Sequence, residues 1–143
     1  MKPYEILEHT ADVGLRIHGR HLKELFAHAA LGLFDLITDC DRIKKEKEAG
    51  PAARTFRLTG EDAGGLLLKW LRELLFTFST KHFVFWKFNF KKITERELEV
   101  AAEGGIFNPS AHEQKYEVKA VTYHQFKIEK TKQGWVAEVI LDI

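Results

Sequence analysis

The chain switches several times between two hydrophobic periods, and this switching limits what it can fold into. Apolar residues recur at every second position in several stretches, which predicts half-buried strands, and at every third or fourth position in two others, which predicts amphipathic helices. No linker rich in Pro, Gly or Ser separates these stretches. We therefore expect one domain over residues 1–143, since a single domain usually holds roughly 100 to 200 residues.

The order of these patterns predicts an α+β fold. Strands are expected at residues 4–7, 15–19, 55–58, 84–90, 98–102, 116–128 and 135–143, and helices at residues 22–37 and from about 59 to 78. Residues 39–53 are charged and aperiodic, which predicts an exposed loop. Short turns between successive strands favour antiparallel pairing. The expected architecture is a layer sandwich, in which a mainly antiparallel sheet of about seven strands carries both helices on one face.

Charge and cysteine content exclude several classes of function. Lys and Arg total 22 against 21 for Asp and Glu, so the net charge of +1 gives no strong overall attraction to nucleic acid or to an anionic membrane. The single cysteine, Cys40, excludes an intramolecular disulfide and a cysteine-based zinc cluster. No apolar run approaches the roughly 18 residues that a membrane span needs. These features favour a cytoplasmic protein that does not enter a membrane.

The sequence contains no familiar catalytic motif. A P-loop, a dinucleotide-binding fingerprint, an HExxH zinc motif and a Gly-x-Ser-x-Gly elbow are all absent. Cys40 lies between Asp39 and Asp41, whose negative charges would raise the pKa of its thiol rather than activate it. We therefore assign no catalytic residue.

Acidic residues near the two ends of the chain are the main candidates for a metal site. Asp12 ends the polar stretch His-Thr-Ala-Asp at residues 9–12, and Asp142 stands next to the terminal Ile143. If the last strand lies beside the first strands, oxygens of Asp12, Asp142 and Ile143 converge at one end of a sheet. Such a set suits Ca²⁺, Mg²⁺ or Mn²⁺ better than zinc. The alternatives are a turn capped by Thr10 or Asp12, and a hydrated chain end.

The expected strand at residues 116–128 offers two further polar candidates. Alternation places Lys119 on one face and His124 on the other. Either residue is a candidate to lie beside the acidic site. The alternatives are a solvated charge for Lys119 and a hydrogen-bonded strand histidine for His124.

Four segments together resemble the archease family. They read HTADVG at residues 9–14, LLLKWLRELL at 66–75, EVKAVTYH at 117–124 and LDI at 141–143, and they cover essentially the whole chain in the family's order. Archeases assist the tRNA-splicing RNA ligase, which joins ends bearing a 2′,3′-cyclic phosphate or 3′-phosphate to a 5′-hydroxyl. The resemblance implies a non-catalytic activator that promotes guanylylation of the ligase's active-site histidine, allows multiple turnover and broadens nucleotide triphosphate use.

The resemblance also implies roles for particular residues. Asp12 and Asp142 match the family's metal ligands, with oxygen added by Ile143, and calcium is the expected ion, with magnesium or manganese as alternatives. His9 and Lys119 are carried over as polar groups around that site. Where family members commonly show Gly-Glu and then an acidic residue before a loop histidine, this chain has Gly104-Gly105 and Asn108 before His112. A functional role for that loop is therefore in doubt.

Two other functions remain open from the sequence. A metal-dependent phosphoesterase would use Asp12 and Asp142 to activate water, and it would turn over phosphoesters without a partner. A chaperone-like modulator of RNA-modifying enzymes, including a tRNA methyltransferase, has also been proposed for the family. Co-purification with a ligase or with a methyltransferase would separate these partners.

Overall fold

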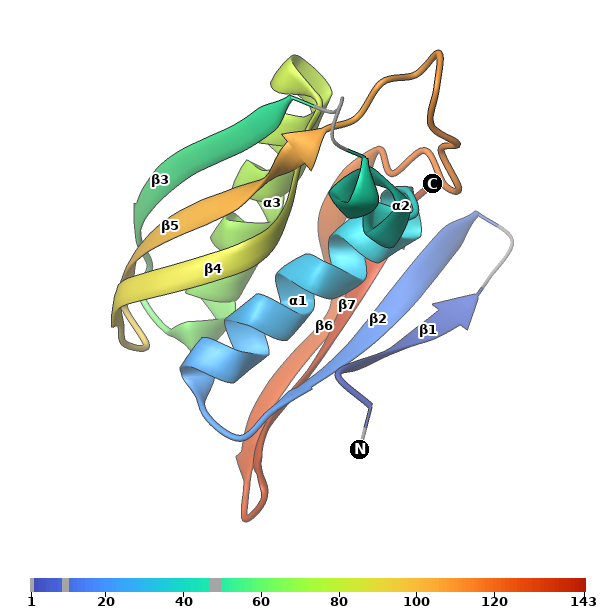
Figure 1. Cartoon of the computed structure of the whole chain (residues 1–143). Coiled ribbons are helices and arrows are strands. Elements are labelled where there is room, and N and C mark those ends of the chain that lie inside the picture. The colour runs from blue at the N-terminus through green and yellow to red at the C-terminus, as the bar shows by residue number, and fades with distance from the viewer. Residues whose placement is uncertain (1, 9–10, 47–49) are drawn as a thin grey trace.

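The computed structural model describes residues 2–8, 11–46 and 50–143 (Figure 1). Within these ranges the elements are β1 (Tyr4–Glu8), β2 (Asp12–Gly19), α1 (Leu22–Ile37), α2 (Cys40–Lys45), β3 (Pro51–Thr59), α3 (Ala63–Lys81), β4 (Phe83–Ile93), β5 (Glu97–Ile106), β6 (Ala120–Thr131) and β7 (Gly134–Asp142). None of the helices in the described ranges is long and apolar enough to cross a membrane.

The strands form two antiparallel sheets, with the orders β1-β2-β7-β6 and β3-β5-β4. The α+β class and the mainly antiparallel strands are thus confirmed, but the strands are divided between two sheets instead of forming one. Helices α1 and α3 lie between the sheets, and each contacts both (Figure 1). Both helices bury residues around much of their circumference, so each needs a packing layer on more than one side.

Aromatic rings occupy the centre of the core. Trp70 of α3 is fully buried and lies edge-on to Phe56, with 5.2 Å between the ring centroids. Phe56 in turn contacts Phe85, and Phe85 contacts Phe34 of α1, each at 5.9 Å. The indole N–H of Trp70 donates a hydrogen bond to the main-chain oxygen of Phe26 at 2.9 Å. This bond joins the two helices and satisfies the only polar atom of a buried tryptophan.

The second helix begins later than the expected residue 59, directly after the acidic residues Glu61 and Asp62. Asp62 is the N-cap of α3, and its Oδ1 accepts a hydrogen bond from the main-chain N–H of Gly65 at 2.7 Å. A carboxylate at this position satisfies one of the free N–H groups of the first turn. This cap fixes the first helical residue as Ala63.

The prediction of an exposed loop at residues 39–53 is wrong for two parts of this segment. Residues 40–45 form the short helix α2, which Asp39 caps by accepting from the N–H of Arg42 at 3.2 Å. Ile43 of α2 is buried against the core, and Ala52 is buried in β3, which already begins at Pro51. Helix α2 and the first residues of β3 each contribute only one buried apolar residue, so neither segment shows a recognisable hydrophobic period in the sequence.

The expected strand at 116–128 begins later, at Ala120, because the preceding residues bond to the end of α1 instead. The main-chain N–H groups of Lys115 and Tyr116 donate to the carbonyl oxygens of Ile37 and Leu36 at 2.8 and 3.2 Å. These carbonyls belong to the last turn of α1, where no partner within the helix is available. The chain then reaches β7, where the N–H of Lys119 donates to the main-chain oxygen of Asp142 at 2.8 Å.

Candidate metal site at the end of the four-stranded sheet

Asp12 and Asp142 face each other at one end of the four-stranded sheet. Asp12 is the first residue of β2 and Asp142 the last residue of β7, and the two are register partners in the antiparallel pair. Directly opposite residues of such a pair have Cβ atoms about 4.5–5.5 Å apart and side chains on the same face. The structure therefore brings together two carboxylates from opposite ends of the sequence.

Alternation along the two strands determines which face carries these carboxylates. Val13 and Leu141, the next pair in register, are completely buried in the core. Since successive side chains point to opposite faces of a sheet, Asp12 and Asp142 lie on the face that points away from the helices. The hydrophobic pattern of the neighbouring residues thus positions the acidic pair.

One oxygen of this pair is buried without a hydrogen-bond donor. In the part of the chain that the structure describes, Asp12 Oδ1 is buried and has no hydrogen-bond partner, whereas the Asp142 side chain is exposed. A buried carboxylate oxygen normally needs a donor or a cation, because burial removes its contact with water. The pair therefore has an unfilled requirement for positive charge or for a hydrogen bond.

Other acidic residues on the same face have such a cation. Arg16 lies two positions further along β2, where its guanidinium contacts Glu138 Oε1 at 2.8 Å and Glu5 Oε2 at 3.0 Å. No comparable ion pair joins Asp12 or Asp142 to a basic side chain within the described ranges. A hard divalent cation would compensate both carboxylates, and oxygen donors are the ligands that such ions prefer.

Side chains alone do not complete a metal-binding set. Among the described residues, no group of three or more His, Cys, Asp or Glu side chains is arranged to hold a metal ion. A third ligand would have to be a main-chain oxygen or water, both of which calcium accepts. Ile143 follows Asp142 directly and packs partly against the core, so its main-chain oxygen is the candidate for this ligand.

Lys119 and His124, both expected near the acidic pair, lie at different distances from it. Lys119 is exposed and bonded through its main chain to Asp142, so it lies beside the acidic pair. His124 is also exposed, but it follows Thr122, which already pairs with Ile140. The structure therefore does not place His124 next to Asp142. His9 and Thr10 lie outside the described residues.

His112, whose role was in doubt, is part of a buried polar contact. Its Nε2 lies 2.7 Å from Glu46 Oε2, and its Nδ1 accepts a hydrogen bond from the N–H of Asn108 at 2.8 Å. The bond from His112 lowers the pKa of the Glu46 carboxyl below its ordinary value. These contacts fasten the segment after β5 to the end of α2. Sequence reasoning missed the pair because nothing local links two residues so far apart along the chain.

Cys40 has the properties of an unreactive thiol. Burial first, and then the nearby Asp35 carboxylate, raises the pKa of Cys40 to about 12. Since the thiolate is the reactive form, this thiol stays protonated near neutral pH.

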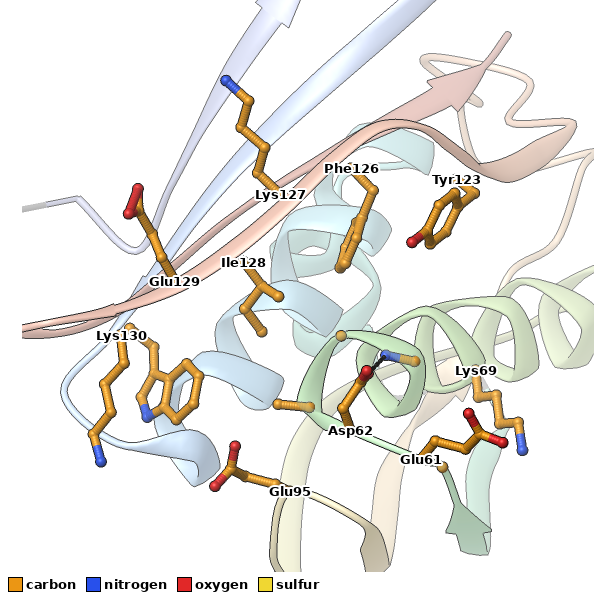
Figure 2. Close-up of a pocket in the computed structure, with 15 residues that line it drawn as sticks. Glu61, Asp62, Lys69, Glu95, Tyr123, Phe126, Lys127, Ile128, Glu129 and Lys130 are labelled. Carbon is orange, nitrogen blue, oxygen red and sulfur yellow. Dashed lines mark hydrogen bonds between the residues drawn. The ribbon is translucent and has the colours of Figure 1, made fainter.

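A groove of about 990 Å³ lies away from the acidic pair, between the start of α3 and β6 (Figure 2). Phe126, Ile128 and Trp135 form its apolar lining, and Asp62 and Glu95 stand on the opposite side. Neither Asp12 nor Asp142 is among the residues that line this groove.

Comparison with known proteins gives consistent matches over the whole chain. Residues 4–143 match the family described as the Archease protein family (MTH1598/TM1083). The chain is 42% identical to the protein archease of Methanosarcina acetivorans over 99% of this chain and 97% of that protein. It is also 42% identical to the protein archease of Saccharolobus islandicus over the full length of both chains.

Solved structures agree with this match. The solution structure of protein 1598 from Methanobacterium thermoautotrophicum shares 36% identity and a TM-score of 0.80, with both chains fully covered. The crystal structure of TM1083 from Thermotoga maritima, described as an archease and possible chaperone, shares the fold with a TM-score of 0.65, at 21% identity over 96% of this chain and 94% of that one.

Proposed function

Because the chain belongs to the archease family, we propose that it activates the RNA ligase of tRNA splicing in the cytoplasm and performs no ligation chemistry itself. The observations that carry this proposal are the register pairing of Asp12 with Asp142 and the buried Oδ1 of Asp12, which has no hydrogen-bond partner among the residues that the structure describes. A site with this unmet requirement is suited to hold a cation at the surface, where a partner can reach it.

Asp12, Asp142 and the main-chain oxygen of Ile143 would hold the cation. Calcium is the proposed ion, with magnesium or manganese as alternatives, because calcium tolerates irregular sets of carboxylate, carbonyl and water oxygens. When bound, the ion would supply positive charge that allows two neighbouring carboxylates to stay ionised, and it could accept further ligands from a partner. The main-chain N–H of Lys119 bonds to the main-chain oxygen of Asp142, which ties the segment before β6 to the strand end that carries the pair.

The sheet holds the two carboxylates in a fixed relative position. Val13 and Leu141 anchor the two strand ends in the core, so the pair is supported by rigid elements and not by a loop. A site on strands keeps its geometry better than one on a flexible segment. The acidic pair is thus suited to dock against one defined conformation of a partner.

Activation of the ligase would follow if this protein binds one conformation of the ligase more tightly than another. Guanylylation of the ligase requires its histidine, the triphosphate and the bound metals to be positioned together. A ligase that spends most of its time in an incompetent conformation gains rate from any protein that binds the competent conformation more tightly, and the gain cannot exceed the ratio of the two affinities. No reactive group on the activator is needed.

Multiple-turnover RNA joining by the cognate ligase tests this proposal. We expect substoichiometric wild-type protein to raise the number of joined products per ligase, and Asp12→Ala and Asp142→Ala each to remove most of that gain. Glu61→Ala is the matched control, since Glu61 is an exposed acidic residue at the groove beside α3, whose lining includes neither Asp12 nor Asp142. Full activation by both aspartate variants would refute the role of the pair.

The same protein samples discriminate the alternatives. A phosphoesterase would hydrolyse phosphoesters without ligase, and this hydrolysis would depend on Asp12 and Asp142. A methyltransferase modulator would change methylation of tRNA and leave RNA joining unaffected.

A further inference from the structure

Strand β6 has an open edge beside the groove shown in Figure 2. It is the last strand of its sheet, and among the described residues it pairs on one side only, with β7. Alternate N–H and C=O groups on its other side point away from the sheet, as in any edge strand, and are available for pairing with another strand.

The first half of this edge is closed. Nε of Arg72 donates to the main-chain oxygen of Val121 at 3.1 Å, which occupies one edge carbonyl. The register then shifts between Thr122 and Lys127, and Gln125 within this bulge has a φ of 52°. Bulges of this kind interrupt regular pairing. The part of β6 that can accept another strand therefore runs from Phe126 to Thr131.

We propose that two copies of this chain associate through this edge, as antiparallel β6 strands related by a two-fold axis at Ile128. In this register Lys127 of each copy lies opposite Glu129 of the second copy, so two ion pairs form across the interface. Neither Lys127 nor Glu129 has an ion-pair partner within the described part of its own chain. Opposite charges placed directly across an antiparallel pair stabilise it.

On the other face, the same axis places Ile128 opposite its copy and Phe126 opposite Lys130 of the second copy. Ile128 lies on the face that lines the groove with Phe126 and Trp135. Ile128 and Phe126 are only partly buried in the single chain. Pairing would cover their exposed surface, which is favourable in proportion to the apolar area removed from water.

Charge and side-chain direction select this register over its neighbours. A shift of the two-fold axis to Glu129 would place two Glu129 carboxylates opposite each other, and a shift to Lys130 would do the same with two ammonium groups. Intermediate registers would place the apolar face of one strand against the polar face of the other, because a slip of one residue reverses every side chain.

The edges of the three-stranded sheet lack this complementarity. β3 carries Arg54 and Arg57, and β4 carries Lys87 and Lys91, all of them exposed. Two copies paired through either edge would bring cations of one strand near cations of the other. Such charges protect an edge against self-pairing.

The proposed contact leaves the acidic pair free. Lys127 lies opposite Glu138, and Asp142 is four residues further along β7. At about 3.4 Å per residue this separation is roughly 14 Å. A dimer formed in this way would present two acidic pairs, and the proposal does not depend on what those pairs bind.

Sedimentation equilibrium over a concentration range of about 1 to 500 µM tests the proposal. We expect a monomer–dimer equilibrium for the wild type, and weakening of the dimer by roughly tenfold or more for Lys127→Glu and for Glu129→Lys, since each creates two like-charge pairs. The double variant Lys127→Glu/Glu129→Lys should restore the wild-type dissociation constant to within about threefold. Lys87→Glu on β4 is the control and should leave the equilibrium unchanged.

A cross-link checks the register directly. In a Cys40→Ser background, Ile128→Cys should form a disulfide-linked dimer on mild oxidation, because opposite residues in such a pair lie close enough for a disulfide. A wild type that stays monomeric over the whole range would overturn the proposal. So would single variants that dimerise like the wild type, or a double variant that fails to recover.

Discussion

Asp12 and Asp142 stand directly opposite each other across β2 and β7, and Oδ1 of Asp12 is buried there without a hydrogen-bond donor in the described structure. Glu138 and Glu5, on the same face, share the guanidinium of Arg16. Among the described residues, a basic side chain thus compensates Glu5 and Glu138, and none compensates Asp12 and Asp142. A bound cation at the acidic pair would compensate these carboxylates as Arg16 compensates Glu5 and Glu138.

Calcium should stabilise the protein through the acidic pair. At a free calcium concentration of about 100 times the dissociation constant, the expected gain in unfolding free energy is about 2.7 kcal/mol. Thermal unfolding with calcium and with a chelator measures this gain. The gain should vanish in Asp12→Asn and Asp142→Asn, and it should persist in Glu61→Gln, whose carboxylate lies elsewhere.

When a chelator removes calcium, Asp142→Asn should not lower the stability of the protein. Without a cation, the two carboxylates repel each other, so Asp142→Asn should be as stable as the wild type or more stable by about 0.5 kcal/mol. A large loss of stability in chelator would instead assign the pair a purely structural role, and it would contradict the metal-site interpretation.

His112→Ala should destabilise the protein by about 1–3 kcal/mol, because it removes a buried ring that bonds to both Glu46 and Asn108. His124→Ala should change stability by less than about 0.5 kcal/mol, since this side chain is exposed. Urea unfolding of both variants measures the difference. Equal effects would show that the His112 contacts contribute little.

Stability should fall on acidification below pH 4.5, partly through Glu24. Hydrogen bonds from the Arg20 side chain and main chain lower the pKa of Glu24 from 4.5 to about 2. A carboxyl whose pKa is lower in the folded state contributes stability above the pKa of the unfolded state and loses it as the pH falls to the folded value. The contribution of Glu24 should thus disappear between pH 4.5 and 2.

Melting temperatures between pH 7 and 2 test this assignment. Glu24→Gln should show a shallower decline than the wild type in that window, because it has no proton to bind. A variant whose curve runs parallel to that of the wild type would show that other carboxyls account for the whole decline.

Gly104→Ala should disturb the pairing of β4 with β5. A methyl group at Gly104 would lie 1.9 Å from the main-chain oxygen of Val84, which cannot move without shifting the strand. We expect a loss of about 2 kcal/mol or more in urea unfolding, as for other forced backbone shifts. Gly65→Ala is the control, since its nearest contact is the Asp62 side chain at 3.3 Å and alanine favours helices.

Periodicity predicted the elements that bury a repeated apolar face. The first helix was expected at 22–37 and is observed at Leu22–Ile37, because buried residues recur along its whole length. The hairpin of β4 and β5 followed from alternation in the same way. α2 was missed because Ile43 is its only buried residue. The division into two sheets was missed as well, since alternation identifies strands but not their neighbours.

For the candidate site, too, the sequence predicted some features and not others. That Asp12 and Asp142 could meet was evident from their positions next to predicted strands, provided that those strands were neighbours. The unpartnered oxygen of Asp12, by contrast, depends on burial by surrounding residues that no local pattern reveals. The contact between His112 and Glu46 likewise arises only when the segment after β5 folds back over α2.

Guanylylation of the cognate RNA ligase is the step that the acidic pair is proposed to accelerate, so its rate is the quantity to measure. Labelled GTP is mixed with ligase and with substoichiometric wild-type protein, Asp142→Asn or the Glu61→Gln control, and label on the ligase is followed over time. We expect the wild type and the control to speed labelling equally, and Asp142→Asn to give the rate of ligase alone. Equal acceleration by Asp142→Asn, or no acceleration by the wild type at any ratio, would contradict this proposal.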